Sequence, residues 1–343
     1  MQRIAEEDLQ HILTNTIGLW EKVRNKSIFI TGATGFFGKW FLESFMYVNN
    51  NLSLNATMSA LSRDPEAFLK ENPFFKHSSI NFIKGNIQTF DFPEGDYHFV
   101  IHAATDSDAQ KNIENLLLMI DTITNGTRRV LEFAQEKSVG SFLFTSSGAV
   151  YGTQLSTVTH IKEDETFPID MKKPVAAYAE GKRLAEVFCS IYHSYYQLPV
   201  KIARCFAFVG PYLPLDKHFA IGNFILNAVN KENIVIKGDG TPYRSYLYAS
   251  DLMIWLWTIL LNGKDNTPYN VGSDEALSLR ELAHVFKEIQ PGIEVKILTP
   301  PEESKPVERY VPNIDMAKQT LGLDVKIKLK EAIEKTISFY GSI

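Results

Sequence analysis

Cysteine is scarce in this chain of 343 residues, which contains only two, Cys189 and Cys205. Both lie among apolar neighbours, so we expect small buried side chains rather than a disulfide. No cysteine and histidine spacing predicts a zinc site, and we expect no metal. Long hydrophobic runs are lacking as well, because the longest, Leu252–Leu261, is too short to span a bilayer. We expect its two tryptophans, Trp255 and Trp257, in the core.

An excess of basic charge is also missing. The formal net charge is −5 and no basic run stands out, which argues against nucleic acid as a partner. Glu6, Glu7 and Asp8 stand where a signal peptide would carry a basic start and an apolar run, so we expect a cytoplasmic protein without a membrane anchor. The hydrophobic content of 45% is ordinary for a globular protein. The length suffices for one large α/β unit or two modest domains.

The order of apolar segments predicts alternating strands and helices. Strands are expected at Ser27–Thr31, Ala56–Ser62, Ile80–Lys84, His98–Ala103, Ser141–Thr145 and Val200–Arg204, and helices at Phe36–Val48, Asn112–Lys137 and Val175–Gln197. This alternation predicts an α/β protein with a parallel, doubly wound sheet. Beyond residue 205, glycines and prolines break the chain into short pieces typical of a smaller, substrate-facing region. In that region we expect Tyr269–Val271 to return to the sheet and Thr299–Pro312 to be a loop.

Residues 1–25 precede this pattern and are expected to form a helical extension. A rough apolar stripe runs through them, made of Ile4, Ile12, Leu13, Ile17, Trp20 and Val23. The stripe predicts a helix packed on the edge of the main domain. A dimer contact is the alternative.

A glycine-rich turn with Gly32, Gly35 and Gly38 follows the first strand and opens the first long helix. In this setting one glycine permits the tight turn, another lets the backbone approach a pyrophosphate, and a third lets helix meet strand. The helix N-terminus then offers N–H groups and a positive dipole end to the phosphates. We therefore predict a Rossmann-type NAD(P)-binding domain over residues 26–205, and a mainly substrate-binding region over residues 206–343.

The end of the second strand bears on the choice between NAD and NADP. An NAD site usually has Asp or Glu there, to accept a hydrogen bond from the ribose 2′-hydroxyl. This chain has Arg63, which could meet a 2′-phosphate and so favours NADP. The alternative is a surface arginine paired with Asp64 or Glu66. We expect NADP or NAD, with a preference for NADP.

Tyr178 and Lys182 lie four residues apart in a predicted helix and so share one face of it. An ammonium beside a phenol favours the phenolate and lowers the pKa of the tyrosine. Such a tyrosine can exchange a proton with an alcohol or carbonyl near neutral pH. The pair predicts a general acid/base, although this spacing also arises by chance.

Together these motifs resemble the extended short-chain dehydrogenase/reductases, and among them the NAD-dependent epimerase/dehydratase family, which acts on nucleotide sugars. The likeness runs from about Lys26 to the C-terminus. The matching segments, in order, are Gly32–Gly38, Gly85–Ile87, His102–Thr105, Thr145–Gly152, Tyr178 with Lys182, Arg204 with Gly210 and Pro211, Gly238–Arg244, and Asn270–Gly272. Any one of them could be chance, but their common order is hard to explain otherwise.

The resemblance implies a nicotinamide cofactor on the sheet. The residues that align with its cofactor contacts are Gly32, Thr34, Gly35, Phe36, Phe37, Gly38, Arg63, Asn86, Ile87, Ala103, Ala104, Thr105, Thr145, Tyr178, Lys182 and Cys205. Asn86 replaces the acidic residue commonly seen near the adenine, but an amide can still bond the ring. Lys182 is expected to hold the nicotinamide ribose and to tune Tyr178.

The resemblance also implies a nucleoside-diphosphate sugar as substrate and a homodimer. The aligned catalytic residues are Ser147, Tyr178 and Lys182, and the aligned substrate contacts are Ser147, Gly148, Asn223 and Arg244. Tyr178 would act at a sugar hydroxyl or ketone, usually at C4, while Ser147 hydrogen-bonds the reacting oxygen. Arg244 would bind the diphosphate, a bidentate task that suits a guanidinium. The alternative for Arg244 is an ion pair with Asp251.

Departures from the family pattern restrict the reaction. Sugar 4,6-dehydratases have an acidic pair at the positions of Gly148 and Ala149, and the decarboxylases tend to have Glu at the second, so dehydration is disfavoured. The family's asparagine after the Arg204 strand is missing, since Ala207 and Phe208 follow instead. Two candidate reactions remain. One is that of a 4-ketoreductase, which the preference for NADP favours, and the other is that of a 4-epimerase that keeps NAD bound. A non-catalytic regulator is disfavoured because the Ser, Tyr and Lys are all present.

Overall fold

The computed structural model describes residues 2–104, 115–215, 219–302 and 306–341. Its centre is a seven-stranded sheet with the order β11-β6-β5-β4-β1-β2-β3, in which every pair is parallel. The strands are β1 (Ser27–Thr31), β2 (Thr57–Ser62), β3 (Ile80–Lys84), β4 (Phe99–His102), β5 (Ser141–Ser147), β6 (Val200–Cys205) and β11 (Pro268–Val271). The order reverses between β1 and β4, which is where doubly wound sheets bind nucleotides. The predicted doubly wound fold is confirmed.

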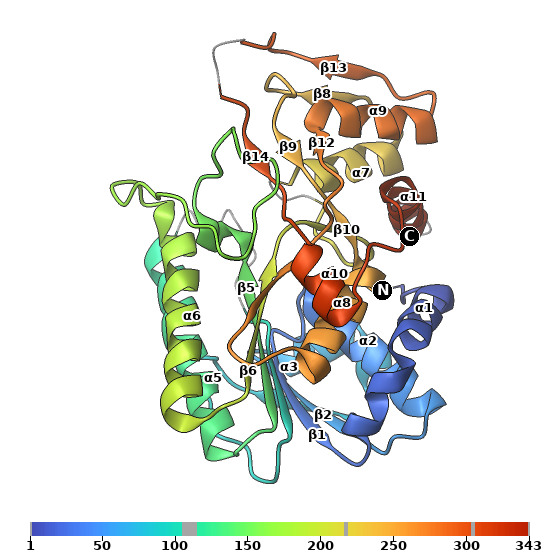
Figure 1. The fold of residues 1–343 in the computed structure, drawn as a ribbon. Coiled ribbons are helices and arrows are strands. Elements are labelled where there is room, and N and C mark those ends of the chain that lie inside the picture. The colour runs from blue at the N-terminus through green and yellow to red at the C-terminus, as the bar shows by residue number, and fades with distance from the viewer. Residues whose placement is uncertain (1, 105–114, 216–218, 303–305, 342–343) are drawn as a thin grey trace.

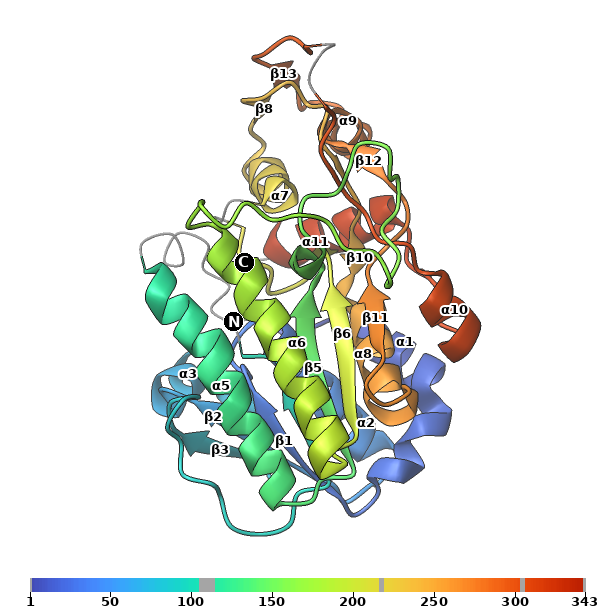
Figure 2. The ribbon, with the colours of Figure 1, turned by 60° about the vertical axis from the view of Figure 1, so that its left-hand side comes forward.

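Helices cover both faces of this sheet, as Figures 1 and 2 show. On one face α5 (Leu116–Glu136) and α6 (Ala176–Tyr196) lie side by side. On the other face α2 (Phe36–Asn51) packs with α8 (Ala249–Asn262), and Trp255 and Trp257 are fully buried there. Strands covered on both faces need apolar residues throughout, which is why their segments read as continuous apolar runs.

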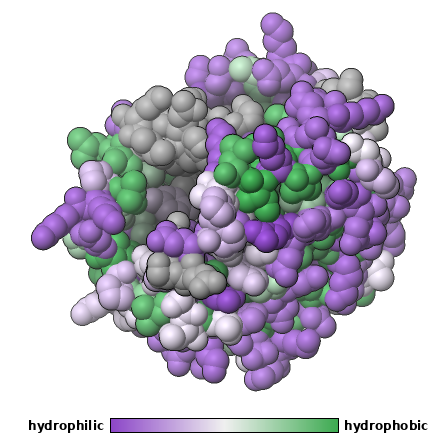
Figure 3. All heavy atoms as spheres, turned by 90° about the horizontal axis from the view of Figure 1, so that it is seen from above, coloured by the Kyte–Doolittle hydropathy of each residue, from purple (hydrophilic) through white to green (hydrophobic). Residues whose placement is uncertain are grey.

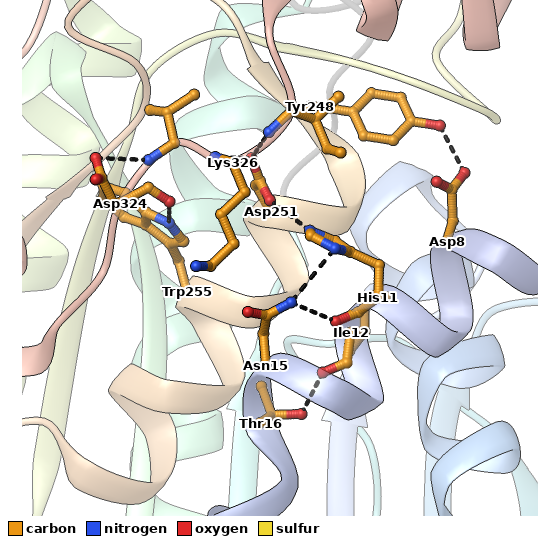
Figure 4. Close-up of polar contacts among 12 residues, drawn as sticks. Asp8, His11, Ile12, Asn15, Thr16, Tyr248, Asp251, Trp255, Asp324 and Lys326 are labelled. Atoms are coloured by element: carbon orange, nitrogen blue, oxygen red, sulfur yellow. Dashed lines mark hydrogen bonds and ion pairs between the residues drawn. The ribbon is translucent and has the colours of Figure 1, made fainter.

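The N-terminal extension folds as α1 (Glu6–Thr16) followed by a 3-10 helix (Ile17–Val23), and it packs against α8 and α2. Its predicted apolar stripe is buried within the chain, except for Ile17, whose side chain is 55% exposed. Polar contacts fix the helix in place (Figure 4). His11 Nε2 lies 3.0 Å from Asp251 Oδ1, and the Tyr248 hydroxyl donates to Asp8 at 2.6 Å.

The C-terminal region lies beyond the carboxyl ends of the strands (Figure 1). It comprises α7 (Ala220–Asn230), β8 (Ile234–Ile236), β9 (Tyr243–Arg244), β12 (Leu277–Ser278), α9 (Leu279–Ile289), β13 (Val295–Ile297), β14 (Arg309–Tyr310) and α11 (Leu329–Gly341). From above, this end shows groups of hydrophobic residues among hydrophilic ones (Figure 3). The segment predicted as a loop, 299–312, contains β14, which pairs with β9. Proline-rich sequence concealed this two-residue strand.

The described residues lack two features that other proteins have. No helix among them has the length and apolar character needed to cross a membrane. Within the same residues, no group of three or more His, Cys, Asp or Glu side chains could hold a metal ion.

Candidate active site

The glycine-rich loop has the shape that a dinucleotide requires. Gly32 has a φ of +73°, and a Cβ there would lie 2.4 Å from the carbonyl oxygen of Ala103. A Cβ on Gly38 would lie 2.3 Å from backbone atoms of Ala33, so only glycine lets α2 approach the loop this closely. Such contacts tolerate no side chain. The loop therefore keeps the end of β1, the end of β4 and the start of α2 together.

The first turn of α2 is open to an anion. Gly35 is the N-cap, no side chain caps the helix, and the first turn contains no acidic residue. Free N–H groups and the helix dipole then favour phosphate at this position. The loop and the helix start together fit the pyrophosphate of a nicotinamide dinucleotide, with Thr34, Phe36 and Phe37 part-buried beside it.

The His102 side chain connects two strands and a helix beneath the site. Its Nδ1 lies 2.8 Å from Thr31 Oγ1, and its Nε2 lies 2.9 Å from Thr127 Oγ1. Burial lowers the pKa of His102 to about 3, with a further contribution from the nearby Lys182. The imidazole is therefore neutral at physiological pH and serves as a structural link between β1, β4 and α5.

Lys182 is buried, with an exposed fraction of 2%, and points at the end of β5. Its ammonium donates to the carbonyl oxygen of Thr145 at 2.8 Å and lies 4.9 Å from the centroid of the Phe144 ring. The Thr145 hydroxyl donates in turn to the carbonyl of His102 at 3.1 Å. Burial lowers the pKa of Lys182 to about 8. The lysine is thus held rigidly beside the site and titrates near the physiological range.

Tyr178 and Ser147 meet at this position. Tyr178 lies one turn before Lys182 on α6, and Ser147, which ends β5, has its hydroxyl near the Tyr178 phenol. Burial raises the pKa of Tyr178, and the Ser147 hydroxyl opposes that rise. The sequence predicted a lowered pKa from Lys182, but in the structure desolvation outweighs any favourable charge. The two residues share a helix face as predicted.

Tyr310 was missed by sequence analysis because it lies outside every motif. A Cβ on Gly148 would lie 2.7 Å from its hydroxyl and 2.9 Å from the Phe206 ring. The Phe206 and Tyr310 rings pack with their centroids 4.7 Å apart. A side chain at position 148 would therefore require the Tyr310 and Phe206 rings to shift. No signal in the sequence pairs Tyr310 with the site, since β14 brings it there.

A part-buried ion pair was also missed and lies beside the end of β5. Arg204 on β6 donates to Glu186 on α6 at 2.8 Å and packs over the Tyr151 ring at 4.8 Å. Glu186 also accepts from the hydroxyl of Ser146. Burial of such a pair requires full hydrogen bonding. The pair joins α6, which carries Tyr178, to the two central strands.

Arg244 lies on β9, and its position among the substrate contacts stays a prediction. Its guanidinium lies 3.6 Å from Glu308 and is 30% exposed. The alternative prediction, an ion pair between Arg244 and Asp251, is wrong. The Asp251 carboxyl group is buried and accepts from the backbone N–H groups of Lys326 and Ile327, and it also contacts His11. Asn223 lies on α7 with its side chain exposed.

The remaining predicted residues fall around the same edge of the sheet. Arg63 is exposed just beyond β2, and no carboxylate of the described residues pairs with it. Asp64, the suggested partner, instead caps α3 (Pro65–Glu71) by accepting from Ala67 N–H at 3.0 Å. Asn86 is exposed and accepts from Gln88 N–H at 2.9 Å.

Ile87, Ala103, Ala104 and Cys205 complete the set. Ile87 packs against α5, where a Cβ on Gly126 would lie 3.1 Å from its side chain. Ala103 and Ala104 are part-buried beyond β4. Burial raises the pKa of Cys205 to about 12, so this thiol stays neutral. Thr105 lies outside the described residues.

A dinucleotide cradle at the switch point of a doubly wound sheet, with a Ser, Tyr and Lys beside it, defines a nicotinamide-dependent enzyme. Comparison with known proteins agrees with this class. Residues 28–272 match the model of the NAD dependent epimerase/dehydratase family. UDP-glucuronic acid decarboxylase 6 of Arabidopsis thaliana is 31% identical over 315 residues, which cover 90% of this chain and 87% of that protein.

Solved structures share the fold. The UDP-glucose 4-epimerase of Thermotoga maritima, solved with UDP-glucose, has a TM-score of 0.76 at 21% identity and covers 92% of this chain and 99% of its own. The dTDP-glucose 4,6-dehydratase of Streptomyces venezuelae, solved with NAD bound, has a TM-score of 0.75 at 22% identity and covers 92% of this chain and 97% of its own.

The chain belongs to the NAD-dependent epimerase/dehydratase family of extended short-chain dehydrogenase/reductases. It is an enzyme of the group that modifies nucleotide sugars. The predicted family is confirmed.

Proposed function

We propose that the protein is an NADP-dependent nucleotide-sugar 4-ketoreductase. The observation that carries this is the lack of an acidic side chain at Gly148, where the Tyr310 hydroxyl and the Phe206 ring lie within 3 Å of the position that a Cβ would take. Ala149 beside it has no ionisable group either. Elimination of water and loss of a carboxyl group use acidic residues at these positions in relatives. Without them, hydride transfer alone is the reaction that the site supports.

Tyr178 is the proton donor in this proposal. Its phenol is protonated near neutral pH, because burial raises its pKa, so it can give a proton to a ketone oxygen at C4. Ser147 hydrogen-bonds the same oxygen, and Lys182 holds the nicotinamide ribose while its ammonium stabilises the phenolate that forms. When bound, the reduced cofactor supplies the hydride. The exposed guanidinium of Arg63, which pairs with no carboxylate of the described residues, supports the choice of NADP over NAD.

A 4-epimerase is the second candidate. It uses the same Tyr178, Ser147 and Lys182, and the likeness to a UDP-glucose 4-epimerase over nearly the whole chain supports it. The two reactions differ in whether the cofactor is consumed. An epimerase returns the hydride to the sugar and leaves the amount of reduced cofactor unchanged.

The test offers the full-length protein a panel of nucleoside-diphospho-4-ketosugars with NADPH, and measures absorbance of the reduced nicotinamide together with NMR spectra of the sugar. A reductase consumes one NADPH for each sugar reduced. Interconversion of two 4-hydroxy sugars without net consumption would instead identify an epimerase. In either case Tyr178→Phe should abolish hydride transfer while NADPH binding persists. Turnover above about a tenth of wild type in that variant would assign the proton to another group.

The protein is further proposed to act as a homodimer through α5 and α6. On α6 the large apolar residues Leu184, Val187, Ile191 and Tyr195 are 41–80% exposed, and their spacing puts them along one side of the helix. Leu117 and Leu118 are similarly exposed at the start of α5. An apolar area on two adjacent helices is typical of an interface. A second copy presenting the same helices would cover it symmetrically.

A further inference from the structure

The chain that leads from β7 (Phe208–Val209) towards α7 follows α2, the helix whose start fits the cofactor pyrophosphate. In the first turn of α2, the Phe37 ring packs edge-on against the Phe208 ring, with the centroids 5.3 Å apart. About one turn further along the helix, the Trp40 indole N–H donates to the carbonyl oxygen of Pro211 at 2.8 Å. The helix that fits the cofactor therefore also holds the chain that enters the predicted substrate-binding region.

Tyr212 continues this contact with a buried hydrogen bond. Its hydroxyl hydrogen-bonds the carboxyl group of Glu43 on α2, and the carbonyl oxygen of Gln2 lies 2.9 Å from the same hydroxyl. The Glu43 side chain is fully buried, and it also accepts from the backbone N–H of Ile4 and from Arg3 Nε, both at 3.3 Å. A buried carboxyl group that loses one of its donors is costly to leave unsatisfied. The hydrogen bond from Tyr212 to Glu43 thus joins the chain before α7 firmly to α2 and to the N-terminal segment.

The backbone of Tyr212 has a conformation that large side chains rarely adopt. Its φ is +70°, which lies in the left-handed region. A bulky residue remains there only where the surrounding structure fixes it, and such positions concentrate where geometry serves function. The contacts that fix Tyr212 are made by its side chain. Besides the bond to Glu43, the ring packs edge-on against Phe339 of α11 at 5.3 Å, and the Lys39 ammonium lies 5.1 Å from the ring centroid.

The residues that follow Tyr212 pack directly against the start of α7. The Tyr340 hydroxyl of α11 donates to the carbonyl oxygen of Leu213 at 2.6 Å. A Cβ on Gly222, in the first turn of α7, would lie 3.2 Å from the carbonyl oxygen of Pro214. Asn223, the predicted substrate contact, is the next residue of the helix. A shift of the chain around Tyr212 would therefore displace Asn223.

We propose that Tyr212 is a positioning residue whose hydrogen bond to Glu43 fixes the start of α7 relative to the cofactor helix and so sets the affinity for the nucleotide sugar. The inference rests on the proposed function for the identity of this ligand. The bond acts on the placement of a binding residue and not on the proton transfer from Tyr178. Its loss is therefore expected to weaken binding of the ground state and the transition state alike, which raises KM and leaves kcat unchanged.

The first test is Tyr212→Phe, which keeps the ring contacts and removes the hydroxyl. Amide hydrogen exchange is followed by mass spectrometry in the full-length protein with NADP bound. We expect the start of α7 to exchange about tenfold faster than in wild type, because the chain beside it is released. Tyr248→Phe, which removes another buried hydrogen bond between a tyrosine and a carboxyl group, is the control and should leave α7 unchanged. Unaltered exchange of α7 in Tyr212→Phe, or an equal increase in both variants, overturns the proposal.

The second test measures binding and turnover. Tyr212→Phe should raise KM for the ketosugar about tenfold at constant kcat, and should weaken the binding of UDP or dTDP in isothermal titration to a similar extent. NADPH affinity should stay the same. In a Glu43→Gln background, adding Tyr212→Phe should cause a smaller loss than in wild type, because the acceptor of the bond is already altered.

Two results of the second test would contradict the role of Tyr212. One is an unchanged KM together with unchanged nucleotide affinity, and the other is a lower kcat at constant KM. If wild type reduces no ketosugar, the proposed function fails, yet nucleotide binding and the exchange of α7 still decide the role of Tyr212.

Discussion

Arg63 is the residue that we propose to bind the 2′-phosphate of NADP at the edge of the cofactor cradle. No acceptor among the described residues pairs with its guanidinium, and Asp64, the neighbouring carboxylate, is engaged in capping α3. A guanidinium in this position distinguishes NADP from NAD only by the group at the 2′ position of the adenosine ribose, because the two cofactors are otherwise identical. The proposed preference for NADP therefore depends on this one side chain.

We expect Arg63→Ala to weaken NADP binding by about ten- to a hundred-fold, the usual loss for a hydrogen bond to a charged group. NAD binding should change little, because it lacks the 2′-phosphate. Isothermal titration with both dinucleotides measures the difference. Lys70→Ala on α3, which removes the same charge from an exposed position, is the control. Equal losses for NAD and NADP would contradict the assignment and weaken the case for reduction.

Arg244 is expected to bind the diphosphate, for which it must exchange its contact with Glu308. Arg244→Ala should raise KM for the nucleotide sugar about ten- to a hundred-fold with kcat nearly unchanged, because the diphosphate keeps its charge during hydride transfer. Steady-state kinetics with the sugar identified above provide the measurement. Glu308→Gln removes the exposed ion pair alone and should not raise KM. A lower kcat at constant KM would place Arg244 in the chemistry.

At the scale of elements, the contact that holds α1 on α8 joins two residues of unequal burial, His11 and Asp251. Asp251 is fully buried and accepts from two backbone N–H groups of the segment that follows α10 (Asp315–Leu321), while His11 is 22% exposed. A fully buried carboxyl group with three partners costs more to remove than a partly exposed ring that contacts Asp251 and the exposed Asn15 side chain. The extension thus ties α8 and the chain near residue 326 together (Figure 4).

Asp251→Ala should therefore lower the free energy of unfolding by about 2–4 kcal/mol, since two N–H groups lose their acceptor. His11→Ala should cost about 1 kcal/mol, because it removes one part-buried hydrogen bond to Asp251 and a long, exposed one to Asn15. Denaturant unfolding monitored by tryptophan fluorescence compares the variants. Asp324→Ala, an exposed carboxylate in the same segment, should change stability by less than about 1 kcal/mol. Similar losses for His11 and Asp251 would refute this account.

The whole molecule buries its sheet on both sides, yet leaves apolar residues of α5 and α6 at the surface. Val187→Glu with Ile191→Glu should convert a dimer to a monomer, because two desolvated charges in an apolar interface cost several kcal/mol. Light scattering coupled to size-exclusion chromatography measures the mass. Val235→Glu on β8 places a charge at a similarly exposed apolar residue far from these helices. A monomeric wild type, or an unchanged mass in the double variant, would exclude this interface.

Sequence reasoning was most successful where the physics is local. The alternation of apolar runs located all seven strands of the sheet, and β1 and β3 match to the residue. The glycines of the cofactor loop were identified because a positive φ and close backbone approach leave no other residue type possible. The shared helix face of Tyr178 and Lys182 was also predictable, because residues four apart in a helix lie on the same face. The sequence by itself thus determined the fold class, the family and the position of the cofactor cradle.

The tertiary structure alone decided which distant side chains meet. Tyr310 lies in a proline-rich segment without periodicity, and only the pairing of β14 with β9 brings it against Gly148 and Phe206. The sequence offered Asp251 as a partner for Arg244, but the oxygens of Asp251 hydrogen-bond α1 and the segment near residue 326. Burial, which sequence spacing cannot show, reversed the expected direction of the Tyr178 pKa. These features depend on long-range packing and desolvation, which arise only after the chain has folded.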